Sequence, residues 1–334
     1  MRQLQVLLVI LIFAGCKSKQ EWIKNQNTGN ALGTTYSIIY ISDQSLDVQK
    51  EIDSVFRVIN KSLSTYIPDS DISKINNGDT TIVVDQSFRD VYFNSQVVNL
   101  ETDGYFDPTV GVLVNAWGFG PGKPIQLDST KVDSLMEYVG WAKVGLKRDF
   151  TIEKTKPEIR FDFNAIAKGY TIDRLGRVLD DKHIDNYLVE LGGEVLTKGI
   201  NKISLKPWTV GIDDPENIEN RGGAAIIHLK GKAMASSGNY RKFRVDEKTG
   251  KKYVHTVNPK TGYTKNSNVL SATVIAKYCM QADAFATAFM TMNLEDTKQL
   301  LASRNDLDAF IIYIDEQGKT VNFMTEGFKE IVVK

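Results

Sequence analysis

Apolar and polar positions along the chain recur with two different periods. Residues 34–41, TTYSIIYI, carry β-branched and aromatic side chains in an alternating pattern, which predicts a strand. Between residues 46 and 63 apolar side chains recur every three or four positions, which predicts a helix. The same spacing predicts further helices over residues 86–101, 129–140, 168–182, 278–292 and 295–303.

Short strand patterns crowd the second half of the chain. In order they read NYLVEL, EVLTKGI, PWTVGI, AAIIHL, KAMAS, YVHTV and VLSATVIA, and a final pair, DAFIIYID and KTVNFM, follows the last helical segments. Blocks of strands interrupted by helices are typical of an α+β fold with mixed or antiparallel sheets flanked by helices. The sequence therefore predicts one such domain over residues 31–334.

The N-terminus has the features of an export signal. The first sixteen residues, MRQLQVLLVILIFAGC, join Arg2 to an apolar run too short to span a bilayer, which predicts a signal peptide over residues 1–15. The Ala-Gly-Cys sequence resembles the bacterial lipobox, so Cys16 is expected to carry a lipid and to begin a polar tether over residues 16–30. Plain secretion without lipidation is the alternative.

Charge and histidine content exclude several classes of function. The 41 basic and 41 acidic side chains give a formal net charge of zero, which provides no long-range attraction to nucleic acid, and no nucleic-acid partner is expected. His183, His228 and His255 lie far apart in the chain, so a histidine-built zinc site is not expected. GFGPGK, residues 118–123, has the wrong glycine spacing for a phosphate-binding loop and indicates a turn. Cys279 stands among apolar neighbours and is expected to be a packing residue.

One carboxylate stands in an otherwise apolar, alanine-rich helical pattern, QADAFATAF, at residues 281–289. Asp283 and Thr287 are four positions apart and therefore share one face of that helix. The surrounding alanines leave room for another backbone to approach. Because Mg²⁺ prefers oxygen ligands, these two residues are candidate ligands. The alternative is that Asp283 caps the start of the helix.

A second polar motif is RFDFNAIAKGYTID, at residues 160–173. Asp162 follows apolar strand residues, where an unpaired carboxylate is costly to bury, so a base, a ribose or a cation is an expected partner. The turn, the helix start and Lys168 together favour an anion such as pyrophosphate. The alternative is an ion pair between Asp162 and Lys168 at a surface turn.

Two further turns carry candidate chemistry. YVHTVNPKTGY, residues 253–263, contains His255, which is either a proton carrier near neutral pH or a hydrogen-bonded edge residue. AMASSGNYRKF, residues 233–243, is predicted to be a small-residue turn whose serines and amides face a polar ligand.

Together these motifs resemble the ApbE family, the FAD:protein FMN transferases. The likeness is carried in chain order by ALGTTYS, LSTYIPDSDIS, GYFDPTVGVLVNAWGFG, DFNAIAKGYTID, LVELGGE, ASSGNY, HTVNPKTG and ADAFATA. It implies a T-fold-like α+β architecture and an exported enzyme, lipid-anchored to a bacterial membrane and facing the periplasm. It also implies that Mg²⁺ and FAD are used to attach FMN, through a phosphoester bond, to a threonine of a partner protein with release of AMP. The acceptors in the family are typically subunits of Na⁺-pumping or Rnf-type redox complexes.

The resemblance also implies roles for particular residues. The backbone carbonyl of Ala165 and the side chains of Asp283 and Thr287 would hold the metal, and His255 and Asp283 would be catalytic. The residues that would contact the flavin nucleotide are Leu32, Tyr66, Tyr105, Phe106, Asp107, Asp162, Lys168 and Val257.

Three positions depart from the family pattern. Leu32 replaces the usual Met, Asn164 stands where Gly is common, and Asn258 replaces the Asp of the HxxDPxTG turn. Two alternative functions stay open: a Mg²⁺-dependent FAD pyrophosphatase, which would use water as the acceptor, and a lipoprotein that binds FAD without chemistry.

Overall fold

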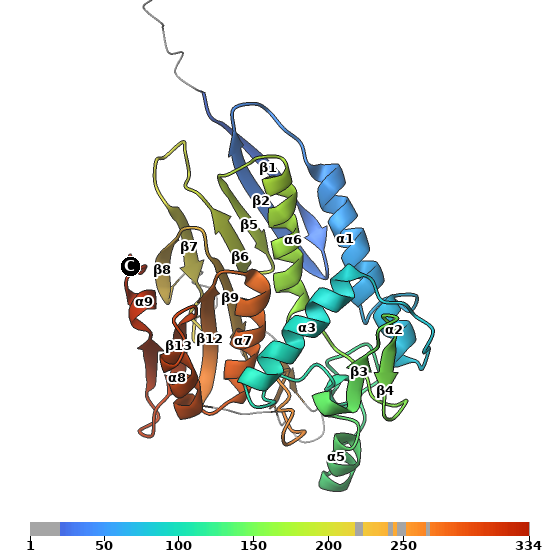
Figure 1. Cartoon of the computed structure of the whole chain (residues 1–334). Coiled ribbons are helices and arrows are strands. Elements are labelled where there is room, and N and C mark those ends of the chain that lie inside the picture. The colour runs from blue at the N-terminus through green and yellow to red at the C-terminus, as the bar shows by residue number, and fades with distance from the viewer. Residues whose placement is uncertain (1–20, 218–222, 240–242, 246–251, 265–267, 334) are drawn as a thin grey trace, which may run out of the picture.

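The centre of the fold is one large antiparallel sheet (Figure 1). The computed structural model describes residues 21–217, 223–239, 243–245, 252–264 and 268–333. Within these residues the sheet has eight strands in the order β1-β2-β5-β6-β9-β12-β13-β14, and each neighbouring pair is antiparallel. The strands are β1 (Ile23–Ala31), β2 (Thr34–Ser42), β5 (Tyr187–Leu191), β6 (Glu194–Lys198), β9 (Ala233–Gly238), β12 (Val269–Ala276), β13 (Asp308–Ile314) and β14 (Thr320–Met324).

Shorter ribbons and the helices surround this sheet and confirm the predicted α+β class. The ribbons are β3 (Val144–Leu146) with β4 (Ile152–Lys154), β7 (Trp208–Ile212) with β8 (Ala225–Leu229), and β10 (Phe243–Val245) with β11 (Lys252–Val254). The helices are α1 (Gln49–Leu63), α2 (Asp71–Asn76), α3 (Gln86–Glu101), α4 (Gly111–Trp117), α5 (Ser129–Met136), α6 (Ala167–Asp181), α7 (Cys279–Thr291), α8 (Leu294–Ala302) and α9 (Glu326–Lys329), with a 3-10 turn at Trp141–Lys143.

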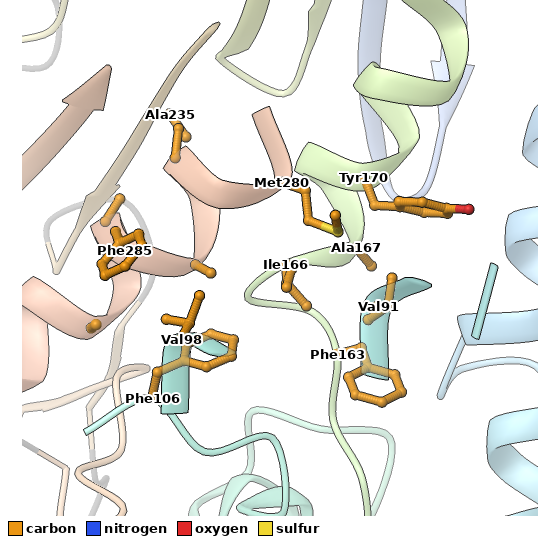
Figure 2. Close-up of a cluster of buried hydrophobic side chains, with 14 of the residues drawn as sticks. Val91, Val98, Phe106, Phe163, Ile166, Ala167, Tyr170, Ala235, Met280 and Phe285 are labelled. Atoms are coloured by element: carbon orange, nitrogen blue, oxygen red, sulfur yellow. The ribbon is translucent and has the colours of Figure 1, made fainter. Parts of the chain in front are cut away.

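The helices are layered on one face of the sheet. Helix α6 packs on β5 and β6, α7 packs on β9 and β12, and the two helices also contact each other. An outer layer follows, in which α1 lies against α6, and α3 lies against both α1 and α7 (Figure 1). The main apolar core fills the space around α7 and α3, as Figure 2 shows for Val98, Phe285 and Met280. This arrangement buries α7 except for the partly exposed Gln281 and Thr287.

The opposite face of the sheet has its own smaller core. Side chains of β7 and β8 pack there with residues of β13 and with Phe328 of α9. The functional motifs lie elsewhere, on the helical side and in the loops beneath it. Within the described residues, we find no helix with the length and apolar character that crossing a membrane requires.

The predicted tether is wrong for residues 23–30, which belong to β1 at the edge of the sheet. This segment, IKNQNTGN, has no apolar pattern, but its backbone pairs with β2 along its whole length. The Asn25 amide is buried and donates to Ser42 Oγ at 2.8 Å. Backbone pairing and polar side-chain bonds thus make the strand, so the domain includes residue 23. The predicted signal peptide and Cys16 lie outside the described residues.

Local differences from the predicted elements have simple causes. Helix α2 is not among the predicted helices; it is a short helix capped by Ser70, whose hydroxyl accepts from the Ser73 amide. Strand β9 confirms the predicted strand KAMAS and continues to Gly238, into the segment 233–243 predicted to be a small-residue turn. Helix α5 ends at Met136 rather than at residue 140. Asp103 and Gly104, with φ of 48° and 76°, form the turn that follows α3.

Candidate functional site

Two helices cap each other at the centre of the molecule. Asp283 of α7 accepts a hydrogen bond at its Oδ2 from the amide of Gly169, in the first turn of α6, at 3.0 Å. In the other direction, Asp173 of α6 accepts from the amides of Cys279 and Met280, the first two residues of α7, at 2.8 and 2.9 Å. Each carboxylate therefore satisfies amides that a helix end leaves unpaired. The alternative in which Asp283 caps its own helix is wrong, because Asp173 has that role.

Close approach of the helix backbones makes these bonds possible. A Cβ atom at Gly169 would lie 2.4 Å from the Cys279 carbonyl oxygen and 2.7 Å from the Met280 Cα. Glycine is therefore required where α6 crosses the start of α7. Figure 2 shows the same crossing from the side chains, with Met280 pointing toward Ala167 and Tyr170.

The Ala165 carbonyl lies one helical turn before Gly169. In a continuing helix the Gly169 amide would donate to this oxygen. That amide donates to Asp283 instead, and within the described part of the chain the Ala165 carbonyl accepts no backbone hydrogen bond. Its lone pairs thus have no backbone donor among these residues, which is a condition for the predicted role as a metal ligand.

Thr287 extends the same face of α7. Its Oγ1 lies 3.3 Å from Ser237 Oγ, on the neighbouring strand β9. One turn further, Thr291 Oγ1 donates to the Tyr105 carbonyl at 2.8 Å. Asp283, Thr287 and Thr291 therefore line up at four-residue spacing, and α7 aligns the start of α6, the end of β9 and the loop after α3 along one face.

Charge at this junction is unbalanced. Lys168 forms an ion pair with Glu194 at the start of β6, and the Asp283 carboxylate also acts on the ammonium group. Burial raises the pKa of Asp283 and of Glu194, while Lys168 opposes both shifts. Burial alone would lower the pKa of Lys168, but Glu194 and Asp283 raise it above its ordinary value. One ammonium thus serves two buried carboxylates, and a further cation would complete the balance.

The donor set fits a hard cation that keeps few protein ligands. No three His, Cys, Asp or Glu side chains in the described residues are arranged as a metal-binding group. A cation here would therefore rely on Asp283, on the hydroxyl of Thr287 and on the Ala165 carbonyl, with substrate or water oxygens completing its shell. Mg²⁺ is commonly bound in this way, through one or two carboxylates plus phosphates. The ligand set stays a prediction.

Tyr66 and Asp162 line one cavity of about 530 Å³. The other lining residues include Asn76, Asn115 and Arg160. The Tyr66 ring is 53% exposed, and its hydroxyl donates to the Phe119 carbonyl at 3.2 Å. Asp162 Oδ1 accepts from the Asn164 amide at 2.8 Å. In such a cavity the exposed ring can stack on a base, and the carboxylate beside it can accept a hydrogen bond from the amino group of that base.

The Asp162–Lys168 ion pair considered from the sequence is replaced by the Lys168–Glu194 pair. Asn164, at a position where Gly is common in the family, is not among the residues with positive φ, so its side chain causes no backbone strain there. The hydrogen bond that its backbone amide donates to Asp162 Oδ1 closes the turn that leads to Ala165.

Three predicted flavin contacts, Tyr105, Phe106 and Asp107, lie in the loop after α3. Their side chains have different environments. The Tyr105 ring lies 4.5 Å from the Lys260 ammonium and is partly exposed. The Phe106 ring is 3% exposed and packs in the core (Figure 2), so ring stacking on a flavin is not open to it. Asp107 is buried and accepts from the Thr109 amide and hydroxyl and from the Trp141 amide, so its carboxylate organises the loop. Burial raises the pKa of Asp107.

The turn that carries His255 borders the same region. The His255 ring lies 6.4 Å from the Phe119 ring, centroid to centroid, and Phe119 is the residue whose carbonyl binds Tyr66. Val257 is buried beside Leu113 and Trp117, so its side chain has a packing role. Flavin contact by Val257 stays a prediction.

The contacts of Asn258 account for its departure from the family pattern. Its Oδ1 accepts from the Lys260 amide at 2.8 Å, and its Nδ2 donates to the Thr291 carbonyl at 3.5 Å. The second bond needs an amide donor, which Asp lacks. The position therefore works as a turn organiser here without a charge.

Leu32 and Gly33 form the two-residue turn between β1 and β2, with φ of 50° and 75°. Both residues are left-handed, as a tight hairpin of the type I′ class requires. The Leu32 side chain is partly buried against the two cores on the helical face of the sheet. The shape of the hairpin, more than a choice between Leu and Met, sets this position.

Sequence reasoning missed Asp173 and Glu194. Both residues stand in motifs that carried the family resemblance, DFNAIAKGYTID and LVELGGE, and both are buried carboxylates. Their partners lie 106 and 26 positions away along the chain, at Cys279 and Lys168. The sequence offered one signal for both residues, which is a charged side chain among apolar neighbours. Cys279 is confirmed as a buried packing residue.

Comparison with known proteins adds independent evidence. Residues 32–311 match the model of the ApbE family. A protein of Haemophilus influenzae named FAD:protein FMN transferase is 33% identical over 334 aligned residues, which cover 96% of this chain and 94% of that protein. A protein of the same name from Vibrio cholerae is 32% identical and covers 99% of each chain.

Solved structures show the same relationship. The flavin transferase ApbE from Vibrio cholerae superimposes with a TM-score of 0.82 and 31% identity, over 93% of this chain and 100% of that chain. The ApbE protein from Thermotoga maritima superimposes with a TM-score of 0.81 and 27% identity over the same shares. The expected architecture is thus confirmed.

Proposed function

The chain belongs to the ApbE family, and we propose that it is a Mg²⁺-dependent FAD:protein FMN transferase that attaches FMN to a threonine of an acceptor protein. It is a transferase of flavin groups by membership of that family. The metal, the threonine and the release of AMP are the parts that the proposal adds.

The observation that carries the proposal is the junction of α6 and α7. A buried carboxylate, Asp283, meets the start of α6, and the Ala165 carbonyl beside it accepts no backbone bond within the described residues. An oxygen-rich corner with excess negative charge is suited to a hard cation. When bound there, Mg²⁺ would offset the charge of the FAD pyrophosphate and stabilise charge on the leaving oxygen.

The protein's own groups would bind and orient the nucleotide. Tyr66 and Asp162 offer a stacking face and an acceptor in the cavity, and Lys168 offers an ammonium near Asp283. In the proposed reaction the threonine hydroxyl attacks the FMN phosphorus, and a new phosphorus–oxygen bond forms. The bond from that phosphorus to the bridging oxygen breaks, AMP leaves with that oxygen, and the hydroxyl loses its proton. Orientation supplies much of the rate in such transfers.

His255 is the proposed acceptor of that proton or the group that orients the hydroxyl. Its ring lies near Phe119, which also contacts Tyr66, so it borders the proposed nucleotide cavity. A neutral imidazole can take a proton near neutral pH.

The place of action is part of the proposal. The apolar run and the Ala-Gly-Cys sequence at the N-terminus support export and lipidation at Cys16. Folded structure by residue 23 leaves a tether of about six residues between lipid and domain, which would keep the enzyme close to the membrane surface. An acceptor in a membrane redox complex, of the Na⁺-pumping or Rnf type, suits that position.

The test is the mass of a threonine-containing acceptor before and after incubation with the protein, FAD and Mg²⁺. We expect the acceptor to gain one FMN group, with AMP formed in equal amount and no gain in EDTA. FMN and AMP in solution with an unchanged acceptor would identify a pyrophosphatase. Bound FAD without AMP would identify a storage protein. Either result would overturn the proposal.

A further inference from the structure

Glu194 is a buried carboxylate whose surroundings a purely structural role does not explain. It begins β6, directly after the turn formed by Gly192 and Gly193, and is 2% exposed. Its Oε1 pairs with the Lys168 ammonium. Its Oε2 is buried and has no hydrogen-bond partner among the residues that the structure describes. Buried polar atoms are normally paired, so this oxygen marks a site with an unmet requirement.

Lys168 links Glu194 to the predicted metal ligands near the start of α6. The lysine stands in the first turn of α6, one residue before the Gly169 amide that binds Asp283. Its side chain is 32% exposed, whereas that of Glu194 is 3% exposed. The ammonium is therefore paired with a buried carboxylate, while the Lys168 side chain as a whole is partly exposed.

A buried ion pair adds little to stability, because desolvating the two charges offsets their attraction. An apolar pair would fill the same space at lower cost. The geometry favours a different use, in which the carboxylate fixes a cation at the place where a ligand anion arrives. Lysine is a flexible point charge, and a fixed partner limits where its ammonium can go.

We propose that Glu194 is a positioning residue that acts through Lys168: it anchors the ammonium beside Asp283, where the ammonium binds a phosphate of the dinucleotide substrate. The inference rests on the proposed function for the identity of that dinucleotide. It assigns the glutamate of the LVELGGE segment a role that depends on Lys168 and has no direct contact with substrate.

A double-mutant cycle tests this dependence. The variants are Glu194→Gln, Lys168→Met and the two combined, and the readout is FAD binding, measured by quenching of flavin fluorescence in EDTA and again with Mg²⁺. We expect Glu194→Gln to weaken FAD binding about tenfold and Lys168→Met to weaken it at least as much. In the Lys168→Met background, Glu194→Gln should have no further effect, because the group through which it acts is gone.

Transfer kinetics supply a second readout. Glu194→Gln should raise the KM for FAD by about the same factor and leave kcat within about threefold, because binding and not the chemical step is weakened. The matched control is Glu190→Gln on β5, since Glu190 accepts from the Gly193 amide and an amide oxygen can do the same. This control should bind FAD like the unaltered protein.

Two results would overturn the inference. Unchanged FAD binding by Glu194→Gln is one, and an equal loss from Glu194→Gln in both backgrounds is the other. If Glu194→Gln does not fold, the combined variant, which removes both charges of the Lys168–Glu194 pair, still has to match Lys168→Met alone. Failure of the proposed function is distinguishable, because the unaltered protein would then bind FAD without modifying the acceptor.

Discussion

The amide of Gly169 and the carboxylate of Asp283 are joined across 114 positions of sequence by a hydrogen bond of 3.0 Å. This bond draws Asp283 to the start of α6 and removes the donor that the Ala165 carbonyl would have in a regular helix. Asp173 ties the same two helices in the opposite sense through Cys279 and Met280. Together the bonds hold a carboxylate and a carbonyl ready for a cation.

The substitution Asp283→Asn removes the negative charge of this side chain and keeps its hydrogen-bond acceptor. Asn retains an oxygen that can accept from Gly169, so the fold should persist, and because burial raises the pKa of Asp283, the neutral amide should not lower stability. Metal-dependent transfer should fall at least about 100-fold, measured as FMN added to the acceptor. Glu295→Gln on the exposed face of α8 is the control. Full transfer by Asp283→Asn would contradict the metal assignment.

The substitution Gly169→Ala should push helices α6 and α7 apart. Its Cβ would meet the Cys279 carbonyl at 2.4 Å, and backbone cannot yield as a side chain does. We expect a loss of about 1–3 kcal/mol or more in the free energy of unfolding, together with reduced transfer. Gly176→Ala in the same helix is the matched control, since its nearest contact, at 2.6 Å, is the side-chain end of Leu196. Equal losses in chemical denaturation for the two variants would refute the special role of Gly169.

Asp173→Asn should change how stability depends on pH. Burial raises the pKa of Asp173 from 3.8 to about 6 in the folded protein. A raised carboxyl pKa stabilises the fold below pH 3.8, and this contribution is lost as pH rises through about 6. The unfolding free energy of the unaltered protein, minus that of Asp173→Asn, should therefore fall by about 3 kcal/mol across this window. Denaturation in EDTA at several pH values measures it, and a flat difference would exclude the shift.

Tyr66→Ala should weaken FAD binding, and Tyr66→Phe should weaken it little. The ring is 53% exposed at the cavity that Asp162 also lines, so it can stack on a base. Stacking of this kind contributes about 1–3 kcal/mol, or roughly a 5- to 150-fold change in Kd. The Phe variant keeps the ring and loses only the bond to the Phe119 carbonyl. Titration with FAD, followed by flavin fluorescence, measures the Kd of both variants. Equal losses of affinity would show that binding depends on the hydroxyl and not on the ring.

Much of the fold followed from local pattern. Helix α3 spans the predicted residues, and α7 differs from its prediction by one residue at each end. The period of apolar positions is a local property, and it needs only one turn or one strand to be visible. β1 escaped prediction because it is a polar edge strand whose partner is β2, and pairing across strands leaves no period in a polar sequence.

The sequence by itself determined that Asp283 and Thr287 share one face of a helix, and its motifs placed the chain in the ApbE family, because both depend on spacing along the chain. Only the tertiary structure decided that Asp283 binds Gly169, that Asp173 caps α7, and that Lys168 pairs with Glu194 instead of Asp162. The physical reason is the packing of α6, α7 and β6. A buried carboxylate must find a donor, and which donor is within reach depends on how these elements cross.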